Sequence, residues 1–156
     1  MRLKILSAVL LALVVGALGA GVPASAAPAK PAVAATQRKV INAADGVWYC
    51  SPLTNGSLCI RYVNNFTGID VHYAKSAGNK IIVRFKYASH TNGTLSQPSA
   101  WGEEYAGGLN SAIWNNASNV TDCMQGVMES KPSDNGTIST YYTPIISKGH
   151  TACTGW

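Results

Sequence analysis

The sequence predicts an all-β fold, a small antiparallel β-sandwich or barrel held by two disulfides. Short runs alternate apolar and polar residues with a period of two, and turns rich in Gly, Asn and Pro separate them. Four cysteines follow an apparent export signal, which favours disulfide bonds. No apolar pattern of helical period persists for three turns beyond that signal. We therefore expect about six to nine short strands.

The first 26 residues have the features of a secretory signal peptide. Arg2 and Lys4 form a basic start, an apolar run covers 5–22, and Ala24-Ser25-Ala26 suits cleavage after Ala26. A retained membrane anchor is the alternative, but the run reaches spanning length only when every Gly and Ala counts as apolar. We expect a secreted, extracellular protein with no stable membrane anchor.

An Ala- and Pro-rich stretch, 27–39, predicts a linker or short pro-segment, and 40–156 predicts one β-domain. The net charge of +5 comes from bases that precede this domain: Arg2, Lys4, Lys30, Arg38 and Lys39. Within the domain, the bases Arg61, Lys75, Lys80, Arg84, Lys86, Lys131 and Lys148 are matched by the acids Asp45, Asp70, Glu103, Glu104, Asp122, Glu129 and Asp134. A nucleic-acid surface needs clustered, uncompensated bases, so we expect no nucleic-acid partner.

A first hairpin is predicted over 48–62, closed by a disulfide between Cys50 and Cys59. Asn55-Gly56 suits a tight turn, and Pro52 removes a main-chain donor where a strand should stop. The other cysteines then pair as Cys123–Cys153, one of three possible connectivities. A zinc site is the alternative, but the cysteine and histidine spacings do not support it, and we expect no metal or cofactor.

Side-chain alternation assigns two faces to this hairpin. If the cysteines face each other, Trp48 lies opposite Arg61, and the guanidinium can lie over the indole. The other face, which we take as the core side, then carries Val47, Tyr49, Ile60 and Tyr62.

A turn is expected over 63–68, followed by two alternating runs, 69–74 and 81–87, which predict a second hairpin. The apolar faces coincide when Val71 pairs with Phe85 and Tyr73 with Val83 across the loop 77–79.

Asp70 and His72 are the weak catalytic candidates of the chain. The predicted register places Asp70 opposite Lys86 and His72 opposite Arg84. An acid and a histidine on one strand face suit an orienting carboxylate and a general base. A solvated sheet face explains them more simply, so we assign no catalytic residue.

Further along, 88–100 reads as a loop, and 101–106 and 112–115 as short strands, with a helical turn over 109–117 as the alternative. A last hairpin joins 120–129 to 137–146 across 131–136.

Three functions fit such a domain. Aromatic and basic side chains would bind a polysaccharide, a cell-envelope ligand or another secreted protein, although aromatics also fill small cores; the candidates are Trp48, Arg61, Trp101 and Trp114. A stapled loop, Ser51–Leu58, would instead present a rigid segment to a protease. A hydrolase would need carboxylates such as Glu103, Glu104 and Asp122, but neighbouring glutamates on a strand point to opposite faces.

The start Ala24-Ser25-Ala26-Ala27-Pro28-Ala29, the four cysteines and the tail Tyr141-Tyr142-Thr143-Pro144 resemble small secreted proteins of actinobacteria. That resemblance implies a bacterial host and no functional residues. The sequence therefore favours a secreted, non-enzymatic binding domain, with a protease inhibitor second and a small hydrolase third.

Overall fold

The protein is a sandwich of two β-sheets in a computed structural model that describes residues 39–117, 120–149 and 153. Its strands are β1 (Val40–Asn42), β2 (Tyr49–Leu53), β3 (Gly56–Val63), β4 (Gly68–Lys75), β5 (Ile81–Ser89), β6 (Thr94–Leu95), β7 (Gly102–Glu104), β8 (Leu109–Trp114), β9 (Cys123–Lys131) and β10 (Ser139–Ser147). The predicted all-β class is confirmed. The predicted signal peptide and nearly all of the predicted linker lie outside the described residues.

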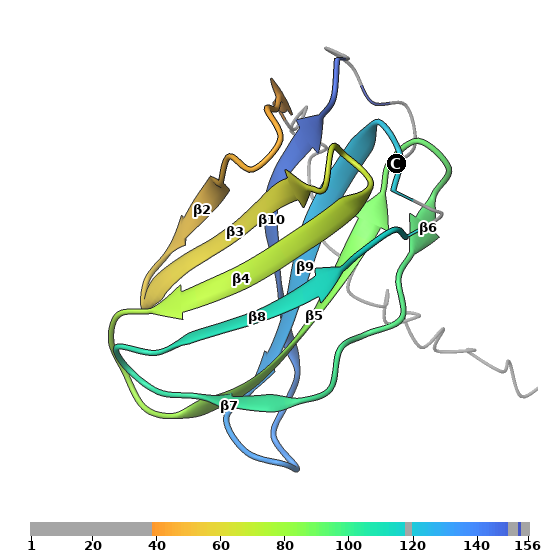
Figure 1. The fold of residues 1–156 in the computed structure, drawn as a ribbon. Coiled ribbons are helices and arrows are strands. Elements are labelled where there is room, and N and C mark those ends of the chain that lie inside the picture. Colours follow the sequence, from red (N-terminus) through yellow and green to blue (C-terminus); the bar gives the residue numbers. More distant parts are fainter. Residues whose placement is uncertain (1–38, 118–119, 150–152, 154–156) are drawn as a thin grey trace, which may run out of the picture. The chain divides into compact units, whose positions relative to one another are not determined.

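The two sheets form separate layers (Figure 1). One has the order β2-β3-β4-β8, and we call it the four-stranded sheet. The other has the order β1-β10-β9-β5-β6, and β7 also pairs with β5. Every pair is antiparallel except β1 with β10. Among the described residues, no helix is long and apolar enough to cross a membrane.

Alternate side chains of both sheets point inward and form one core, as the period of two requires. The four-stranded sheet contributes Leu58, Ile60, Tyr62, Ile69, Val71 and Tyr73, and the other sheet, with Ala43 directly after β1, contributes Val83, Phe85, Tyr87, Met124, Met128 and Ile146. The Tyr62 hydroxyl donates a hydrogen bond to the Asp122 carbonyl oxygen at 2.8 Å, and burial raises the pKa of that hydroxyl.

The first hairpin and its disulfide are confirmed. Cys50 pairs with Cys59 in the β2–β3 register and bonds to it covalently. Tyr49, Ile60 and Tyr62 point inward as predicted.

Two details of this hairpin differ from the prediction. Val47 is exposed rather than buried, because it lies at the end of the turn 44–47 that precedes β2. Pro52 lies within β2 and does not end it, because an edge strand tolerates a proline that a central strand would not.

The predicted pairing of β4 with β5 is wrong. Both strands exist, and Val71, Tyr73, Val83 and Phe85 are buried as expected. However, β4 pairs with β3 and β8, whereas β5 pairs with β9, β6 and β7 in the other sheet. The chain crosses between the sheets over 76–80, where Gly78 takes a left-handed conformation with φ of 82°.

The later elements follow the prediction more closely. β9 and β10 form the expected last hairpin, with a register shift between Tyr142 and Ile145. Residues 109–114 form β8, so the helical alternative is wrong. The second disulfide joins Cys123 to Cys153, which confirms the predicted connectivity.

Candidate ligand-binding face

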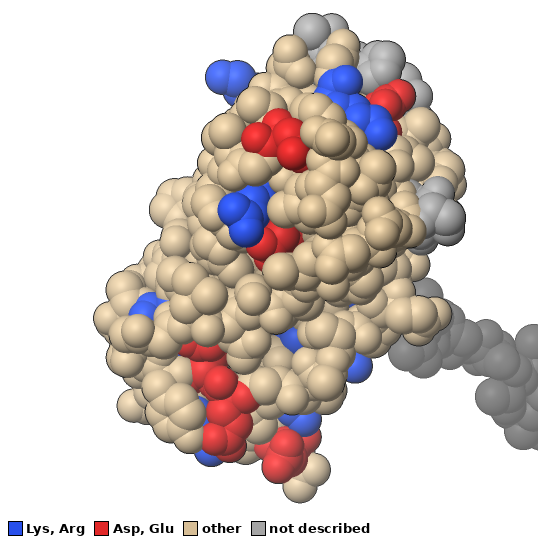
Figure 2. Space-filling model, viewed as in Figure 1, with Lys and Arg blue, Asp and Glu red and all other residues tan. Residues whose placement is uncertain are grey.

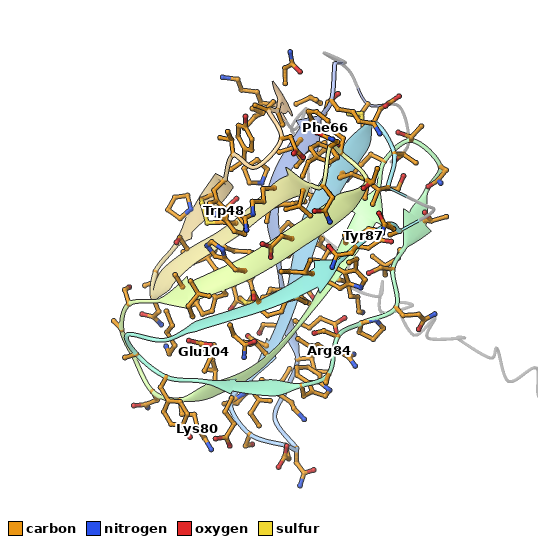
Figure 3. All side chains as sticks on the ribbon, in the orientation of Figure 1. Trp48, Phe66, Lys80, Arg84, Tyr87 and Glu104 are labelled. Carbon is orange, nitrogen blue, oxygen red and sulfur yellow. A yellow bond between two sulfur atoms is a disulfide. The ribbon has the colours of Figure 1, made fainter. Side chains whose placement is uncertain are left out.

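A cluster of aromatic and charged side chains lies on the outer face of the four-stranded sheet. Arg61 pairs with Asp70 in the β3–β4 register, and His72 follows Asp70 by two residues on the same face. Trp48 precedes β2 and reaches the same place beside Arg61 (Figure 3). We call Trp48, Arg61, Asp70 and His72 the Trp48 surface.

Two neighbours hold the indole of Trp48. The Arg61 guanidinium carbon lies 4.1 Å from the centre of the Trp48 ring, so the predicted cation–π contact is confirmed. The His72 ring centre lies 3.9 Å from that of Trp48, with the two planes inclined at 57°. As a residue, Trp48 is partly buried.

Asp70 is buried beneath this cluster, and its predicted pairing with Lys86 on a solvated face is wrong. The Arg61 atoms Nε and Nη2 donate hydrogen bonds to Asp70 Oδ2 at 3.1 and 2.8 Å. Asp70 is only 3% exposed, and within the described part of the chain its Oδ1 has no hydrogen-bond partner. The carboxylate therefore neutralises Arg61 and fixes its position under the indole.

His72 is a neutral side chain of the surface at neutral pH. Burial lowers its pKa, the Asp70 carboxylate opposes that effect, and the Arg61 guanidinium reinforces it. His72 lies opposite Cys59 and Ser111, not opposite Arg84 as predicted. In the described residues, no hydrogen bond joins its ring to Asp70 or to Ser111. A neutral imidazole ring has one donor and one acceptor nitrogen.

A disulfide joins the two strands below this cluster, and the face around the cluster carries few charges. Cys50 and Cys59 lie on the same face, because Cys50 follows Trp48 by two residues and Cys59 precedes Arg61 by two residues. Beyond them is an open depression of about 520 Å³ lined by Gly56, Ser57, Ala74, Lys75, Ser76, Gly107, Gly108 and Leu109. Figure 2 shows this side of the molecule as mostly uncharged, with acidic and basic atoms in small neighbouring spots.

The other two predicted ligand-binding tryptophans lie elsewhere. Trp101 packs under Arg84 and Lys131, whose charged atoms lie 4.4 and 4.6 Å from its ring centre. Trp114 packs against the core, edge-on to Tyr87 with ring centres 5.1 Å apart. Neither of them joins the Trp48 surface.

The carboxylates considered for hydrolysis have separate surroundings. Glu103 is exposed and accepts hydrogen bonds from Lys80 at 2.6 Å and Tyr105 at 2.5 Å. Glu104 is 3% exposed, and burial raises its pKa although Lys75 opposes the shift. Asp122 lies 3.9 Å from Lys148. Over the described ranges, no group of three His, Cys, Asp or Glu side chains is placed to hold a metal ion.

The segment proposed as an inhibitor loop is not an open loop. Ser51 pairs with Leu58, Pro52 with Ser57 and Leu53 with Gly56. Only Thr54 and Asn55 remain as the turn, because the ladder takes up the rest of the segment.

Sequence reasoning identified all four residues but separated them into two sites. It placed Trp48 and Arg61 together, and it placed Asp70 and His72 on a different hairpin. The signal that unites them is the turn 64–67, which joins β3 directly to β4 and sets Arg61 opposite Asp70.

No protein-family model, no curated protein and no solved structure matches this chain. The fold and cross-links define a small β-domain with two disulfides. Such a domain is consistent with an extracellular protein, because disulfides persist in oxidising surroundings.

Proposed function

We propose that this protein is a secreted, non-enzymatic binding domain whose Trp48 surface holds a neutral saccharide chain of a cell envelope. The observation that carries the proposal is a partly buried Trp48 side chain held by Arg61 and His72 beside a disulfide-linked pair of strands. A preorganised aromatic side chain loses little conformational freedom on binding, which favours recognition.

The chemistry of the surface suits a sugar. A sugar ring presents apolar C–H groups on its faces and hydroxyls at its edge, and the part of the indole that Arg61 and His72 leave uncovered would offer an apolar, polarisable contact. The neutral His72 ring supplies a donor and an acceptor beside that plane. Asp70 compensates the Arg61 charge, so the surface offers no net positive site to a polyanion.

The open geometry favours binding over hydrolysis. His72 packs at an angle against Trp48, and the Asp70 carboxylate accepts hydrogen bonds from Arg61 rather than from the histidine ring. A histidine that acts as a general base oriented by a carboxylate needs a hydrogen bond between the carboxylate and its ring. The depression beside the surface is shallow and open, which suits a polymer that lies across the sheet.

Sedimentation with insoluble cell-wall glycan, chitin and cellulose, followed by calorimetry with soluble oligomers of any glycan that binds, tests this proposal. We expect Trp48→Ala to weaken binding at least tenfold. Trp101→Ala is the matched control, because it removes an indole from the other sheet, and it should bind like the wild type. Equal binding by Trp48→Ala and wild type, or no binding to any of these glycans, would contradict the proposal.

A further inference from the structure

β8 lies at one edge of the four-stranded sheet (Figure 1). An exposed edge offers unpaired main-chain groups to another strand, and proteins usually block it with proline, charge or a very short strand. At the opposite edge of the same sheet, β2 contains Pro52. In the other sheet, β1, β6 and β7 have two or three residues each. β8 has six residues, without a proline or a charged side chain.

The free main-chain groups of β8 belong to Leu109, Ser111 and Ile113. The Lys75 amide donates to the Gly108 carbonyl at 3.0 Å, and this bond sets the phase of the β4–β8 ladder. Because antiparallel pairs alternate, Asn110, Ala112 and Trp114 bond to β4, and the intervening residues point their N–H and C=O groups away from it. In the described ranges, no main-chain hydrogen bond outside the ladders uses those groups.

The side chains of the same residues are open to solvent. Leu109 is 63% exposed and Ile113 is 53% exposed, which is unusual for two large apolar residues on one strand. Ser111 lies between them and is also exposed. β7 approaches β8 at Asn110, whose side chain lies on the inner face against Gly102. The outer edge of β8 is therefore available.

We propose that two copies of this chain pair through β8, antiparallel about a two-fold axis at Ser111. Ser111 then faces Ser111 of the second copy, and Leu109 faces Ile113 on both sides of the axis. In each of these pairs, the N–H of each residue donates to the C=O of the other, because the main-chain groups of all three residues point away from β4. The result is one continuous sheet of eight strands.

A second copy fits this edge better than an unrelated strand because the edge is complementary to itself. Leu109, Ser111 and Ile113 give the order apolar, hydroxyl, apolar in both chain directions. A two-fold axis at Ser111 therefore places Leu109 of each copy beside Ile113 of the other. β8 carries no charge, so two copies do not repel each other there. This proposal does not depend on the proposed saccharide ligand.

Sedimentation velocity of the secreted chain tests the pairing over about 1 µM to about 1 mM, the range for an interface of a few strand residues. The wild type should approach twice the monomer mass as concentration rises. The double variant Leu109→Lys/Ile113→Lys should stay monomeric throughout, because each lysine would face another lysine across the axis.

The double variant Leu109→Lys/Ile113→Glu is the matched control. In the antiparallel register, its introduced lysine faces the introduced glutamate of the second copy, so it should dimerise at least tenfold more tightly than the lysine pair variant. Monomeric wild type at the highest concentration would overturn the proposal. So would a lysine pair variant that dimerises like the wild type, or a Lys/Glu variant that is as monomeric as the lysine pair.

Discussion

Arg61 compensates the charge of a carboxylate that the sheet buries. Asp70 is 3% exposed on a central strand, and its hydrogen bonds come from the Arg61 guanidinium. An isolated buried carboxylate would be costly, whereas a paired one is tolerated. The same contact presses the guanidinium against Trp48, so one ion pair serves both stability and the candidate binding surface.

We expect Arg61→Met to lower the free energy of unfolding by about 2–3 kcal/mol, because it leaves Asp70 charged and buried without a partner. Adding Asp70→Asn should recover most of that loss, because the buried group is then neutral. Urea unfolding of the wild type, both single variants and the double variant measures the coupling. Purely additive effects would contradict this role for the ion pair.

The carboxyls of Glu129, which is partly buried, and Glu104, which is buried, predict opposite pH effects. Burial alone would raise the pKa of Glu129, but hydrogen bonds from Lys86 and Arg84 outweigh it and lower that pKa below its ordinary value of 4.5. Its stabilising contribution is therefore complete above that value and is lost as pH falls through the folded-state pKa. Glu104 is the reverse case, because burial raises its pKa and the folded state is penalised as pH rises.

Glu129→Gln should therefore destabilise the protein at about pH 7 and lose that effect at about pH 3. Glu104→Gln should stabilise it at about pH 7, with the gain vanishing at the same acidic pH. Urea unfolding from about pH 3 to pH 7 checks both variants. If both variants changed the free energy of unfolding in the same direction at neutral pH, the two carboxyls would not differ in the way proposed.

At the scale of the strands, Gly126 sets how closely the two sheets approach. A Cβ atom there would lie 3.0 Å from Val71 Cγ1 in the opposite sheet and 2.9 Å from Thr143 Cγ2. The glycine in β9 thus makes room for a valine in β4, which is how the core closes at this point.

Gly126→Ala should cost about 1–3 kcal/mol of folding free energy through overpacking. Val71→Ala should also destabilise, because it leaves a cavity. The double variant Gly126→Ala/Val71→Ala should be more stable than the sum of the two losses predicts, since the new methyl fills part of that space. Thermal unfolding of the three variants measures this, and additive losses would argue against the contact.

The sequence predicted the strands and their inward faces better than it predicted their partners. Ile69, Val71 and Tyr73 alternate with polar residues, and so do Val83, Phe85 and Tyr87. Two strands that pair in one sheet and two that face each other across a sandwich give the same alternation, because both bury one face in the same core. Neither the pattern nor the short connection 76–80 distinguishes these two arrangements.

The candidate site was also predicted only in part, because its residues lie on strands whose partners the sequence did not determine. The contact of Trp48 with Arg61 followed from a cysteine pair that fixed the register of a local hairpin. The position of Asp70 opposite Arg61 follows from the local β3–β4 hairpin, which the prediction replaced with a β4–β5 pairing. The burial of Asp70 also depends on β8, and that pairing places Asp70 beside Ile113, which no short window of residues contains.

For the whole molecule, the two disulfides should contribute unequally to stability. Cross-links restrict the unfolded chain more when they close longer loops. Cys50–Cys59 spans 9 positions and Cys123–Cys153 spans 30. On the chain-entropy estimate, these loops correspond to about 2.7 and about 3.7 kcal/mol.

Cys123→Ser/Cys153→Ser should therefore unfold at lower denaturant concentration than Cys50→Ser/Cys59→Ser. Guanidinium unfolding of both variants, each with the other disulfide intact, tests this order. Cys50→Ser/Cys59→Ser should weaken the proposed glycan binding more than Cys123→Ser/Cys153→Ser does, because the Cys50–Cys59 disulfide lies beside the Trp48 surface. The reverse order of stability would mean that native-state strain or packing outweighs loop length.

If two copies pair through β8 as proposed, the outer faces of both four-stranded sheets lie on one side, which has a consequence for avidity. The two Trp48 surfaces, whose Arg61 residues lie on β3, would then be about five strand spacings, or roughly 24 Å, apart. A long glycan could occupy both surfaces at once, so its second contact would benefit from a high effective concentration. A short oligosaccharide could reach only one of them, and polymer length would then govern retention at the cell wall as much as sugar identity does.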